Sequence, residues 1–274
     1  MQLPTENVRI VDLSVLVSEA LPTSWPGHMT FAHKNWTWFE SVDHPASVVR
    51  SSGPYSTNFI VMDEHCGTHL DGPTHFIPPS ASGLPHAGPY GDVTGDKVDL
   101  TALWGPCAVI DVSELSGTGD DGRSPVIAPE HVLQWEAQFG RLRPGEVVLW
   151  RTGWDRWYVE GQDADRYLAD PLVRAARPGW PAPEIPVMGL LHDRGVRLVC
   201  TDGASMGSVH DGAPVHQYAL ARGVMFVEML TALDQLPARG GFFCFLPLKI
   251  GGSTGGPGRA IALLPADEAL PSPA

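Results

Sequence analysis

A dense group of ionisable side chains lies in the stretch HCGTHLDGPTHF, at residues 65–76. His65, His69, Asp71 and His75 all carry odd numbers, so in an extended strand their side chains would project from one face. Neutral imidazoles and a carboxylate are common ligands of a divalent catalytic ion, and such a set leaves coordination positions open for water. The pattern therefore predicts a metal site. The competing interpretation is a histidine-rich surface loop whose rings are satisfied by hydrogen bonds.

Glycine and proline determine how this stretch can fold. A helix would place His65 and His69 one turn apart, but Gly67, Gly72 and Pro73 make a helix costly. A flat strand would hold the two histidines roughly 13 Å apart, which is beyond the reach of one ion. We therefore expect a strand that bends at Gly67 and then turns at Gly72-Pro73, so that the last histidine of the motif lies at the rim of the site.

A second pair of ionisable residues lies in the C-terminal third of the chain. Glu228 is the lone carboxylate in the apolar segment VMFVEML, and His216 precedes it in a predicted helix. A charge in a buried strand is costly unless it is paired or bound to a cation. This cost favours a functional role for Glu228, although a glutamate at a strand edge facing water is an equally open interpretation.

Other polar residues give weaker signals. His210 and Asp211 are explained equally well by a polar turn, whereas Asp202 ends a predicted strand and is a candidate partner for site residues. Ser205 lacks the GxSxG context of a serine hydrolase. The segment GGSTGGPG at 251–258 lacks the GK[ST] ending of a phosphate loop, so a close backbone turn is the better interpretation.

Short apolar segments predict the elements that must position these residues. Strands are expected at Val8–Leu16, Thr57–Met62, Cys107–Val112, Val147–Thr152, Val196–Thr201, Val224–Leu230, Phe242–Leu248 and Ala260–Leu264. Helices are expected at Pro129–Phe139, Pro186–Arg194 and Asp211–Arg222. The alternation indicates one mixed α/β domain over residues 1–265, with a frayed tail at 266–274. Residues 116–124 and 177–186 are predicted to be surface loops.

Composition limits the function classes. The chain has 274 residues and is 43% hydrophobic, which is typical of a globular protein with a large core. A net charge of -13, with only 18 basic residues, disfavours nucleic acid as a partner. No apolar segment is long enough to span a membrane, and the N-terminus does not resemble a signal peptide, so we expect a cytoplasmic protein. The four cysteines are scattered without a CxxC pair, which favours reduced thiols.

The motif at 65–76 resembles the HxGTHxDxPxHF signature of the metal-dependent cyclase family, which includes kynurenine formamidases, isatin hydrolases and related γ-lactam hydrolases. Further similar segments occur in the same order: VDLSVLVSEALPTSWPG, VVLWRTGW, VRLVCTDGASMG, HQYALARGVMFVEML and FLPLKIGGSTGGPGRAIAL. The resemblance implies a central mixed, barrel-like sheet flanked by helices, of the swivelling β/β/α type. It also implies homodimers or homotetramers.

The same resemblance assigns roles to individual residues. His65, His69 and Asp71 match the family's metal ligands, and His75 matches its catalytic histidine. His216 and Glu228 match a pair that binds a second metal in some members and lines the site in others. Aromatic residues, with Trp25 and Trp154 as the first candidates, are expected to form the wall of the substrate pocket.

These parts predict a hydrolase that cleaves the C–N bond of a small cyclic amide of the isatin or γ-lactam type. We expect Mn²⁺ or Zn²⁺ to lower the pKa of a bound water from 15.7 toward about 7, so that hydroxide attacks the carbonyl while His75 moves the proton. A kynurenine formamidase, a cyclase or dehydratase with the same metal site, and a non-catalytic metal-binding protein are the alternatives.

Overall fold

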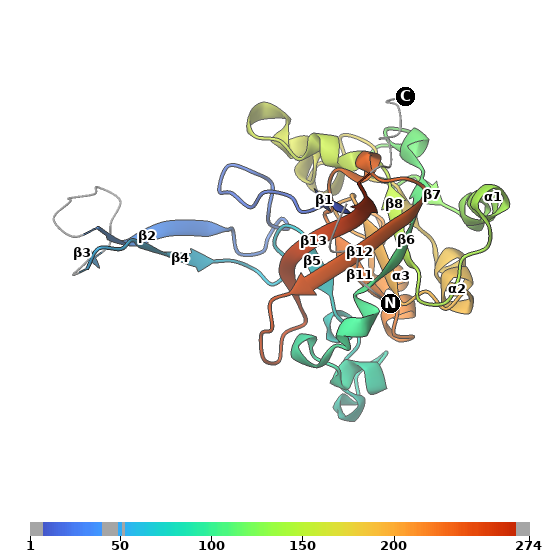
Figure 1. The fold of residues 1–274 in the computed structure, drawn as a ribbon, viewed down its shortest axis with the longest axis horizontal. Helices are drawn as coiled ribbons and strands as arrows, with labels where there is room; N and C mark the ends of the chain where they lie inside the picture. The colour runs from blue at the N-terminus through green and yellow to red at the C-terminus, as the bar shows by residue number, and fades with distance from the viewer. Residues whose placement is uncertain (1–7, 40–48, 51–52, 267–274) are drawn as a thin grey trace.

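The computed structural model describes residues 8–39, 49–50 and 53–266. Its main sheet contains β1 (Val8–Asp12), β5 (His69–Asp71), β6 (Trp104–Asp111), β8 (Val147–Arg151), β10 (Leu198–Thr201), β11 (Met225–Glu228), β12 (Arg239–Pro247) and β13 (Gly255–Pro265). The strand order is β1-β13-β12-β6-β8-β10-β11-β5, and a further pairing of β13 with β5 closes the sheet. The barrel-like mixed sheet expected from the resemblance is therefore confirmed (Figure 1).

Alternating side chains explain why the barrel strands are apolar throughout. In β6 and β8, Cys107, Val109, Val147 and Leu149 belong to the cluster that fills the barrel. The residues between them belong to a second cluster formed with the helices, among them the fully buried Trp150. Because strands covered on both faces need apolar residues at every position, the continuous hydrophobic segments of the sequence become parallel barrel strands.

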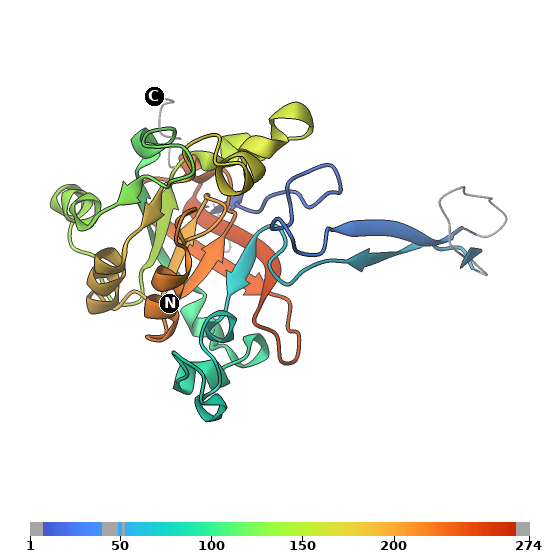
Figure 2. The ribbon, with the colours of Figure 1, turned by 180° about the vertical axis from the view of Figure 1, so that it is seen from behind.

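Three α-helices cover the outer face of the sheet, at the end away from residues 32–38 and 57–61 (Figures 1 and 2). They are α1 (Pro129–Phe139), α2 (Ile185–Asp193) and α3 (Ala213–Leu220), each with a proline in its first turn, where the missing N–H costs nothing. The helices lie within the segments predicted for them or begin one residue earlier.

A two-stranded ribbon projects from the barrel (Figure 1). It consists of β2 (Ala32–Trp38) and β4 (Thr57–Val61), with the short β3 (Val49–Arg50) beside β2. Only the second strand of this ribbon was expected from the sequence, because β2 reads AHKNWTW and contains no continuous apolar segment. A separate small sheet pairs β7 (Val126–Ile127) with β9 (Ala182–Pro183).

Short helical turns fill the remaining connections. The 3₁₀ turns lie at Pro73–His75, Ser80–Ser82, Pro89–Asp92, Gly95–Lys97, Leu100–Ala102, Ser113–Leu115, Trp154–Trp157, Gly161–Arg166 and Leu233–Gln235, and one π turn lies at Ala169–Val173. The prediction of a surface loop at 177–186 is wrong at its centre, since Trp180 is fully buried and donates its Nε1–H to the carbonyl of Gly207 at 2.8 Å. The prolines and glycine around Trp180 indicated a loop, but they gave no sign that the tryptophan itself is buried.

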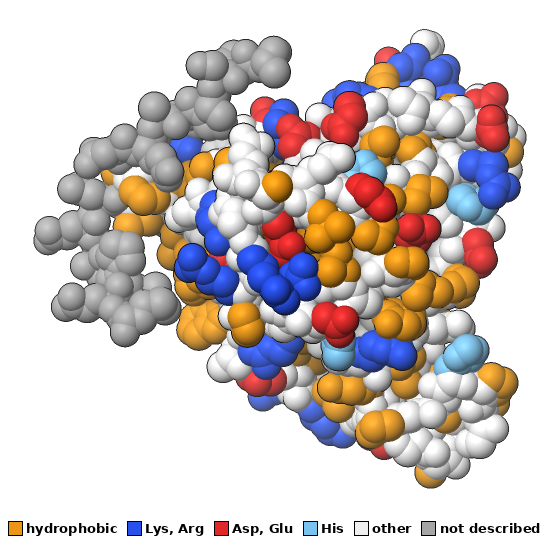
Figure 3. All heavy atoms as spheres, turned by 90° about the vertical axis from the view of Figure 1, so that its right-hand side faces the viewer, with side chains coloured by type: hydrophobic (Ala, Val, Ile, Leu, Met, Phe, Trp, Pro, Cys, Tyr) orange, Lys and Arg blue, Asp and Glu red, His pale blue; other side chains and the backbone are white. Residues whose placement is uncertain are grey.

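Several sequence predictions concern the molecule as a whole. Residues 267–274 of the predicted tail lie outside the described residues, and the domain limits at 1–265 stay a prediction. No helix in the described part of the chain is long and apolar enough to cross a bilayer, while a cytoplasmic location stays a prediction. On the face drawn in Figure 3, acidic and basic side chains are interspersed among hydrophobic ones.

Candidate metal centre

Strand β5 brings the central motif residues onto the outer face of the barrel. It lies between β11 and β13, and His69 pairs in register with Glu228. Leu70 and Val227 point into the barrel core, so the residues that flank them in each strand point outward. His69, Asp71 and Glu228 therefore share one face, although all three are buried.

The expectation of an extended strand is correct only for the middle of the motif. The strand covers His69–Asp71, whereas His65 lies in a turn and His75 ends the 3₁₀ turn Pro73–His75. The predicted bend at Gly67 is present, with φ of 62°, a left-handed conformation that favours glycine. This bend brings the rings of His65 and His69 to a centroid separation of 5.1 Å. The convergence comes from turns, not from strand periodicity.

The first group of potential ligands consists of His65, His69 and Asp71. Nδ1 of His65 lies 2.8 Å from Oδ1 of Asp71, and Nε2 of His69 lies 3.4 Å from the same oxygen. Nδ1 of His69 lies 2.7 Å from the carbonyl oxygen of Gly67, which can only accept, so this nitrogen carries the proton. The lone pair of His69 therefore lies on Nε2, which faces the aspartate.

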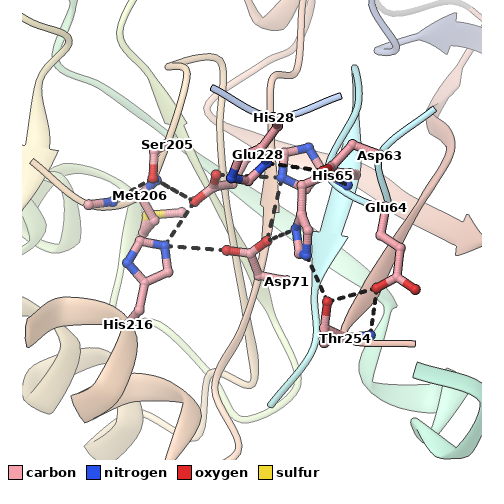
Figure 4. Close-up of polar contacts among 12 residues, drawn as sticks. His28, Asp63, Glu64, His65, Asp71, Ser205, Met206, His216, Glu228 and Thr254 are labelled. Carbon is pink, nitrogen blue, oxygen red and sulfur yellow. Dashed lines mark hydrogen bonds and ion pairs between the residues drawn. The ribbon is translucent and has the colours of Figure 1, made fainter. Parts of the chain in front are cut away.

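The second group consists of Asp71, His216 and Glu228, so that Asp71 belongs to both (Figure 4). Nε2 of His216 lies 3.3 Å from Oδ2 of Asp71 and 3.3 Å from Oε1 of Glu228. Nδ1 of His216 donates to the carbonyl oxygen of Gly212, the residue that precedes α3, at 2.8 Å. Glu228 also accepts from the backbone N–H of Met206 and from the hydroxyl of Ser205.

These contacts show that the donor set fits a divalent cation. With neutral rings, the inward nitrogens of His69 and His216 present lone pairs to two carboxylates that are themselves only acceptors. Acceptors buried against one another repel unless protons or a cation lie between them. In each group the ligand atoms lie within 4.8 Å of one another, a spacing that one ion can bridge. Imidazole nitrogen and carboxylate oxygen together suit zinc or manganese.

Burial and neighbouring charges set the ionisation of the site. Burial opposes a charge on Asp71, yet His75, His216, His65 and His69 together hold the pKa of Asp71 well below its usual value. Burial also disfavours a charged His216, but hydrogen bonds to Asp71 and Glu228 outweigh it and raise the pKa of His216 to about 10. The site is therefore built around a charged Asp71.

His75 differs from the other histidines of the motif. It stacks on His65 with ring centroids 3.9 Å apart, and its ring forms no side-chain hydrogen bond with another described residue. Burial, together with the adjacent imidazoles of His65, His216 and His69, lowers the pKa of His75 to about 4. At neutral pH its ring is uncharged and can accept a proton.

A cavity of about 340 Å³ opens over these residues. The potential ligands and His75 all line it. The other lining residues are Trp25, His28, Phe76, Leu168, Leu172, Ala204, Ser205, Gly207, Ser208, Val209, Gly212, Ala213 and Met229. Trp25 lies on this wall, as expected. Trp154 does not, because its ring packs against Trp180 and donates its Nε1–H to the carbonyl of Tyr167. The sequence could not distinguish a lining tryptophan from one that packs behind the wall.

The weaker candidates lie outside the metal centre. Asp202 is buried but accepts from the backbone N–H groups of Thr152 and Gly153, each at 2.8 Å, and so anchors the loop after β8. His210 accepts from the N–H of Ser124 in a turn that also contains Asp211. His210 and Asp211 thus lie in the polar turn given as their alternative, whereas Asp202, expected as a partner of site residues, binds the loop after β8 instead.

Two residues in contact with the site carried no individual signal in the sequence. The hydroxyl of Thr254 lies 2.9 Å from Nε2 of His65, and Glu64 accepts from both the N–H and the hydroxyl of Thr254. Thr254 comes from GGSTGGPG, where only the glycines stood out. Gly255 explains part of that composition, because a Cβ there would lie 1.9 Å from the carbonyl oxygen of Leu70.

Comparisons with known proteins agree with this geometry. The chain is 32% identical over 227 residues to an isatin hydrolase of Roseibium aggregatum. The matched region covers 81% of this chain and 80% of that protein. The chain is also 31% identical over 218 residues to a kynurenine formamidase of Paracidovorax citrulli, covering 78% of this chain and 82% of the relative.

Solved structures give the same relationship. An isatin hydrolase bound to the product analogue thioisatinate superimposes with a TM-score of 0.73 at 25% identity, covering 94% of this chain and 93% of the other. Isatin hydrolase A from Labrenzia aggregata, bound to benzyl benzoate, gives a TM-score of 0.72 at 28% identity and covers 96% of each chain. The family model described as "Putative cyclase" matches residues 11–208. This chain therefore belongs to the cyclase family.

Proposed function

We propose that the chain is a metal-dependent hydrolase that cleaves the C–N bond of a small cyclic amide of the isatin type. The observation that carries the proposal is the set of imidazole nitrogens of His65, His69 and His216 that converge on Asp71 and Glu228 at the wall of an apolar cavity. Relatives named isatin hydrolase and kynurenine formamidase support the reaction class, since both names denote hydrolysis of a carbon–nitrogen bond.

The ligand roles follow from the contacts. His65, His69 and Asp71 would hold one Mn²⁺ or Zn²⁺ ion, and His216 and Glu228 would complete a second position through Asp71. A divalent cation supplies Lewis acidity, lowering the pKa of a water molecule and stabilising charge on an amide oxygen. The Gly67 and Gly212 carbonyls fix His69 and His216 in the tautomers that binding requires.

His75 is the proposed proton carrier. It lines the cavity, makes no competing side-chain hydrogen bond within the described residues and is neutral above about pH 4. In that state it accepts the proton of the attacking water and returns it to the leaving nitrogen as the ring opens. Its stacking on His65 holds the ring beside the ligand cluster.

The lining of the cavity favours a neutral, flat substrate. Trp25, Phe76, Leu168, Leu172 and Val209 supply apolar surface, and no lysine or arginine occurs among the described lining residues. An uncharged cyclic amide can bury its ring there at no electrostatic cost. The amino-acid carboxylate of N-formylkynurenine would find no lysine or arginine among the described lining residues, so the formamidase activity is the second candidate.

Steady-state hydrolysis of isatin, a bicyclic γ-lactam and N-formylkynurenine, followed by ultraviolet absorbance, tests this function. The metal-free enzyme should be inactive, and Mn²⁺ or Zn²⁺ should restore a kcat/KM that is highest for a neutral cyclic amide. Undiminished turnover after exhaustive chelation would contradict the proposal. A preference for N-formylkynurenine would replace the first candidate with the second.

We also propose that the protein forms a homodimer or homotetramer. The ribbon of β2 and β4 projects from the barrel and leaves apolar side chains in water, including Trp36 at 47% and Ile60 at 53% exposure (Figure 1). An isolated two-stranded ribbon is at best marginally stable, and such surface is characteristic of an interface. Light scattering after gel filtration should give a mass of two or four chains, and a monomer would contradict this.

A further inference from the structure

The contact between Glu64, Thr254 and His65 joins the motif to a loop far along the chain (Figure 4). Glu64 Oε2 accepts from the backbone N–H of Thr254 at 2.8 Å and from its hydroxyl at 2.8 Å. The same hydroxyl oxygen lies 2.9 Å from Nε2 of His65. Three polar groups therefore form one short line, with the carboxylate at one end and the imidazole at the other.

The chemistry of these groups fixes the direction of the hydrogen bonds. An ionised carboxylate only accepts, and a hydroxyl has a single proton to donate. The hydroxyl of Thr254 therefore donates to Glu64, and its oxygen must accept from Nε2–H of His65. A neutral imidazole protonated at Nε2 carries no proton at Nδ1, the atom that lies 2.8 Å from Oδ1 of Asp71.

Without this line, the opposite tautomer would be favoured. A neutral His65 facing Asp71 at 2.8 Å gains a charge-assisted hydrogen bond by placing its proton on Nδ1. That proton would occupy the only His65 nitrogen directed at the first ligand group. The line through Thr254 works against this arrangement, because it requires the proton at Nε2.

The backbone around Thr254 holds the hydroxyl in place. The carbonyl of Thr254 accepts from the N–H of Gly72 at 2.9 Å, and Gly255 pairs in register with Asp71. Gly255 approaches so closely that a Cβ would also lie 3.0 Å from Cε1 of His65. The loop before β13 is thus built against the motif, which gives the GGSTGG segment a function beyond that of a turn.

We propose that Thr254 and Glu64 are positioning residues that keep His65 protonated at Nε2 and so present Nδ1 to the metal. The inference rests on the proposed metal-dependent function and deepens it, since it assigns control of the first ligand group to a loop outside the histidine motif. Neither residue needs to touch substrate.

Metal affinity of the purified full-length protein tests the inference without any substrate. In competition with a chromophoric chelator, Thr254→Val should bind Zn²⁺ about 10- to 100-fold more weakly, the usual cost of losing a partner that orients a ligand. Thr254→Ser keeps the hydroxyl and should bind nearly as wild type. Glu64→Gln should fall between them, because an amide can present either a donor or an acceptor to Thr254.

A matched control separates tautomer control from simple anchoring of the loop. The hydroxyl of Thr74 donates to the carbonyl of Ser253 at 3.3 Å, so Thr74→Val removes a bond to the same loop without touching His65. This variant should keep wild-type affinity for Zn²⁺. Thermal unfolding of each variant shows whether a weaker affinity reflects loss of fold.

Long-range ¹H–¹⁵N spectra of histidine-labelled, Zn²⁺-loaded protein observe the tautomer directly. We expect a proton on Nε2 of His65 in the wild type and in Thr254→Ser, with faster exchange of that proton in Thr254→Val. A proton on Nδ1, or equal affinities of wild type and Thr254→Val, would overturn the inference while leaving metal-dependent hydrolysis intact. A different result would contradict the proposed function: hydrolysis by the wild type that persists without metal.

Discussion

Asp71 and Asp202 are both only 1% exposed, yet their surroundings shift their pKa values in opposite directions. Asp71 faces imidazole rings, which hold its pKa well below the usual value despite burial. Asp202 faces backbone N–H groups and the hydroxyl of Thr152, yet burial and the nearby carboxylate of Asp155 raise its pKa to about 7. Burial alone therefore does not distinguish a ligand from an anchor.

The difference lies in what the neighbours can donate. The N–H groups of Thr152 and Gly153 donate to the oxygens of Asp202, and Asp202 belongs to neither potential ligand group among the described residues. The nitrogens that face Asp71 include Nε2 of His69 and Nε2 of His216, whose Nδ1–H groups donate to the carbonyl oxygens of Gly67 and Gly212. The carboxylate of Asp202 anchors a loop, and the carboxylate of Asp71 belongs to both groups that could hold a metal ion.

Exchange of each carboxylate for an amide should separate the two roles most strongly. Asp71→Asn should lower kcat/KM for a cyclic amide by about 10³-fold or more, because several kcal/mol of transition-state stabilisation depend on the metal. Asp202→Asn should keep most of the activity, since the side chain of Asp202 hydrogen-bonds to Thr152 and Gly153, which do not line the cavity. Comparable losses in the two variants, measured with metal in excess, would erase the distinction.

The neighbours of the two aspartates should divide in the same way. His75→Gln should reduce kcat by about 100-fold or more, as expected for loss of a general base, while the metal content stays unchanged. Thr152→Val, beside Asp202, should leave kcat near the wild-type value. A His75→Gln enzyme with wild-type kcat would remove His75 from the mechanism.

Stability should show the anchoring role of Asp202. Asp202→Ala leaves the N–H groups of Thr152 and Gly153 without their acceptor, and should lower the free energy of unfolding by about 1–3 kcal/mol. Asp202→Asn keeps one oxygen acceptor and should destabilise the protein less than Asp202→Ala does. Urea unfolding monitored by tryptophan fluorescence measures both, and an Asp202→Ala variant as stable as the wild type would contradict this account.

The pH dependence of stability gives the smallest and most specific difference. The pKa of Asp202 is raised from 3.8 to about 7, so between these values the folded protein keeps a proton that the unfolded chain has lost. Its contribution to stability is complete below about pH 4 and is lost as pH rises through about 7.

Asp202→Asn removes this proton exchange but keeps a similar shape. Relative to the wild type, its free energy of unfolding should therefore fall less steeply between about pH 4 and 7, by up to ~1.4 kcal/mol per pH unit. Parallel curves for the two proteins would show that Asp202 ionises normally in the folded state.

The sequence predicted the parts of the molecule that depend on local patterns. Continuous apolar segments such as Val147–Arg151 became barrel strands, and the bend at Gly67 followed from the need to bring two histidines together. Strand β2 was missed because its polar residues pair across a ribbon instead of entering a core.

Contacts between segments that are distant in the sequence could not be predicted from local patterns. Nothing near Thr254 shows that its hydroxyl reaches His65, because that contact depends on the pairing of β13 with β5. The same limit applies to Trp154, which resembles a pocket residue in sequence but packs behind Trp180. The ligand group itself could be predicted from the sequence because most of its residues lie within one short motif.

The most direct test of the central claim is an equilibrium titration of the metal-free protein with Zn²⁺ or Mn²⁺. The wild type and Asp202→Asn should each bind tightly and recover cyclic-amide hydrolysis in proportion to the metal bound. Asp71→Asn should show no tight binding and no recovery. Tight binding by Asp71→Asn, or full hydrolysis by the metal-free wild type, would contradict the assignment of Asp71 and its histidines as a catalytic metal centre.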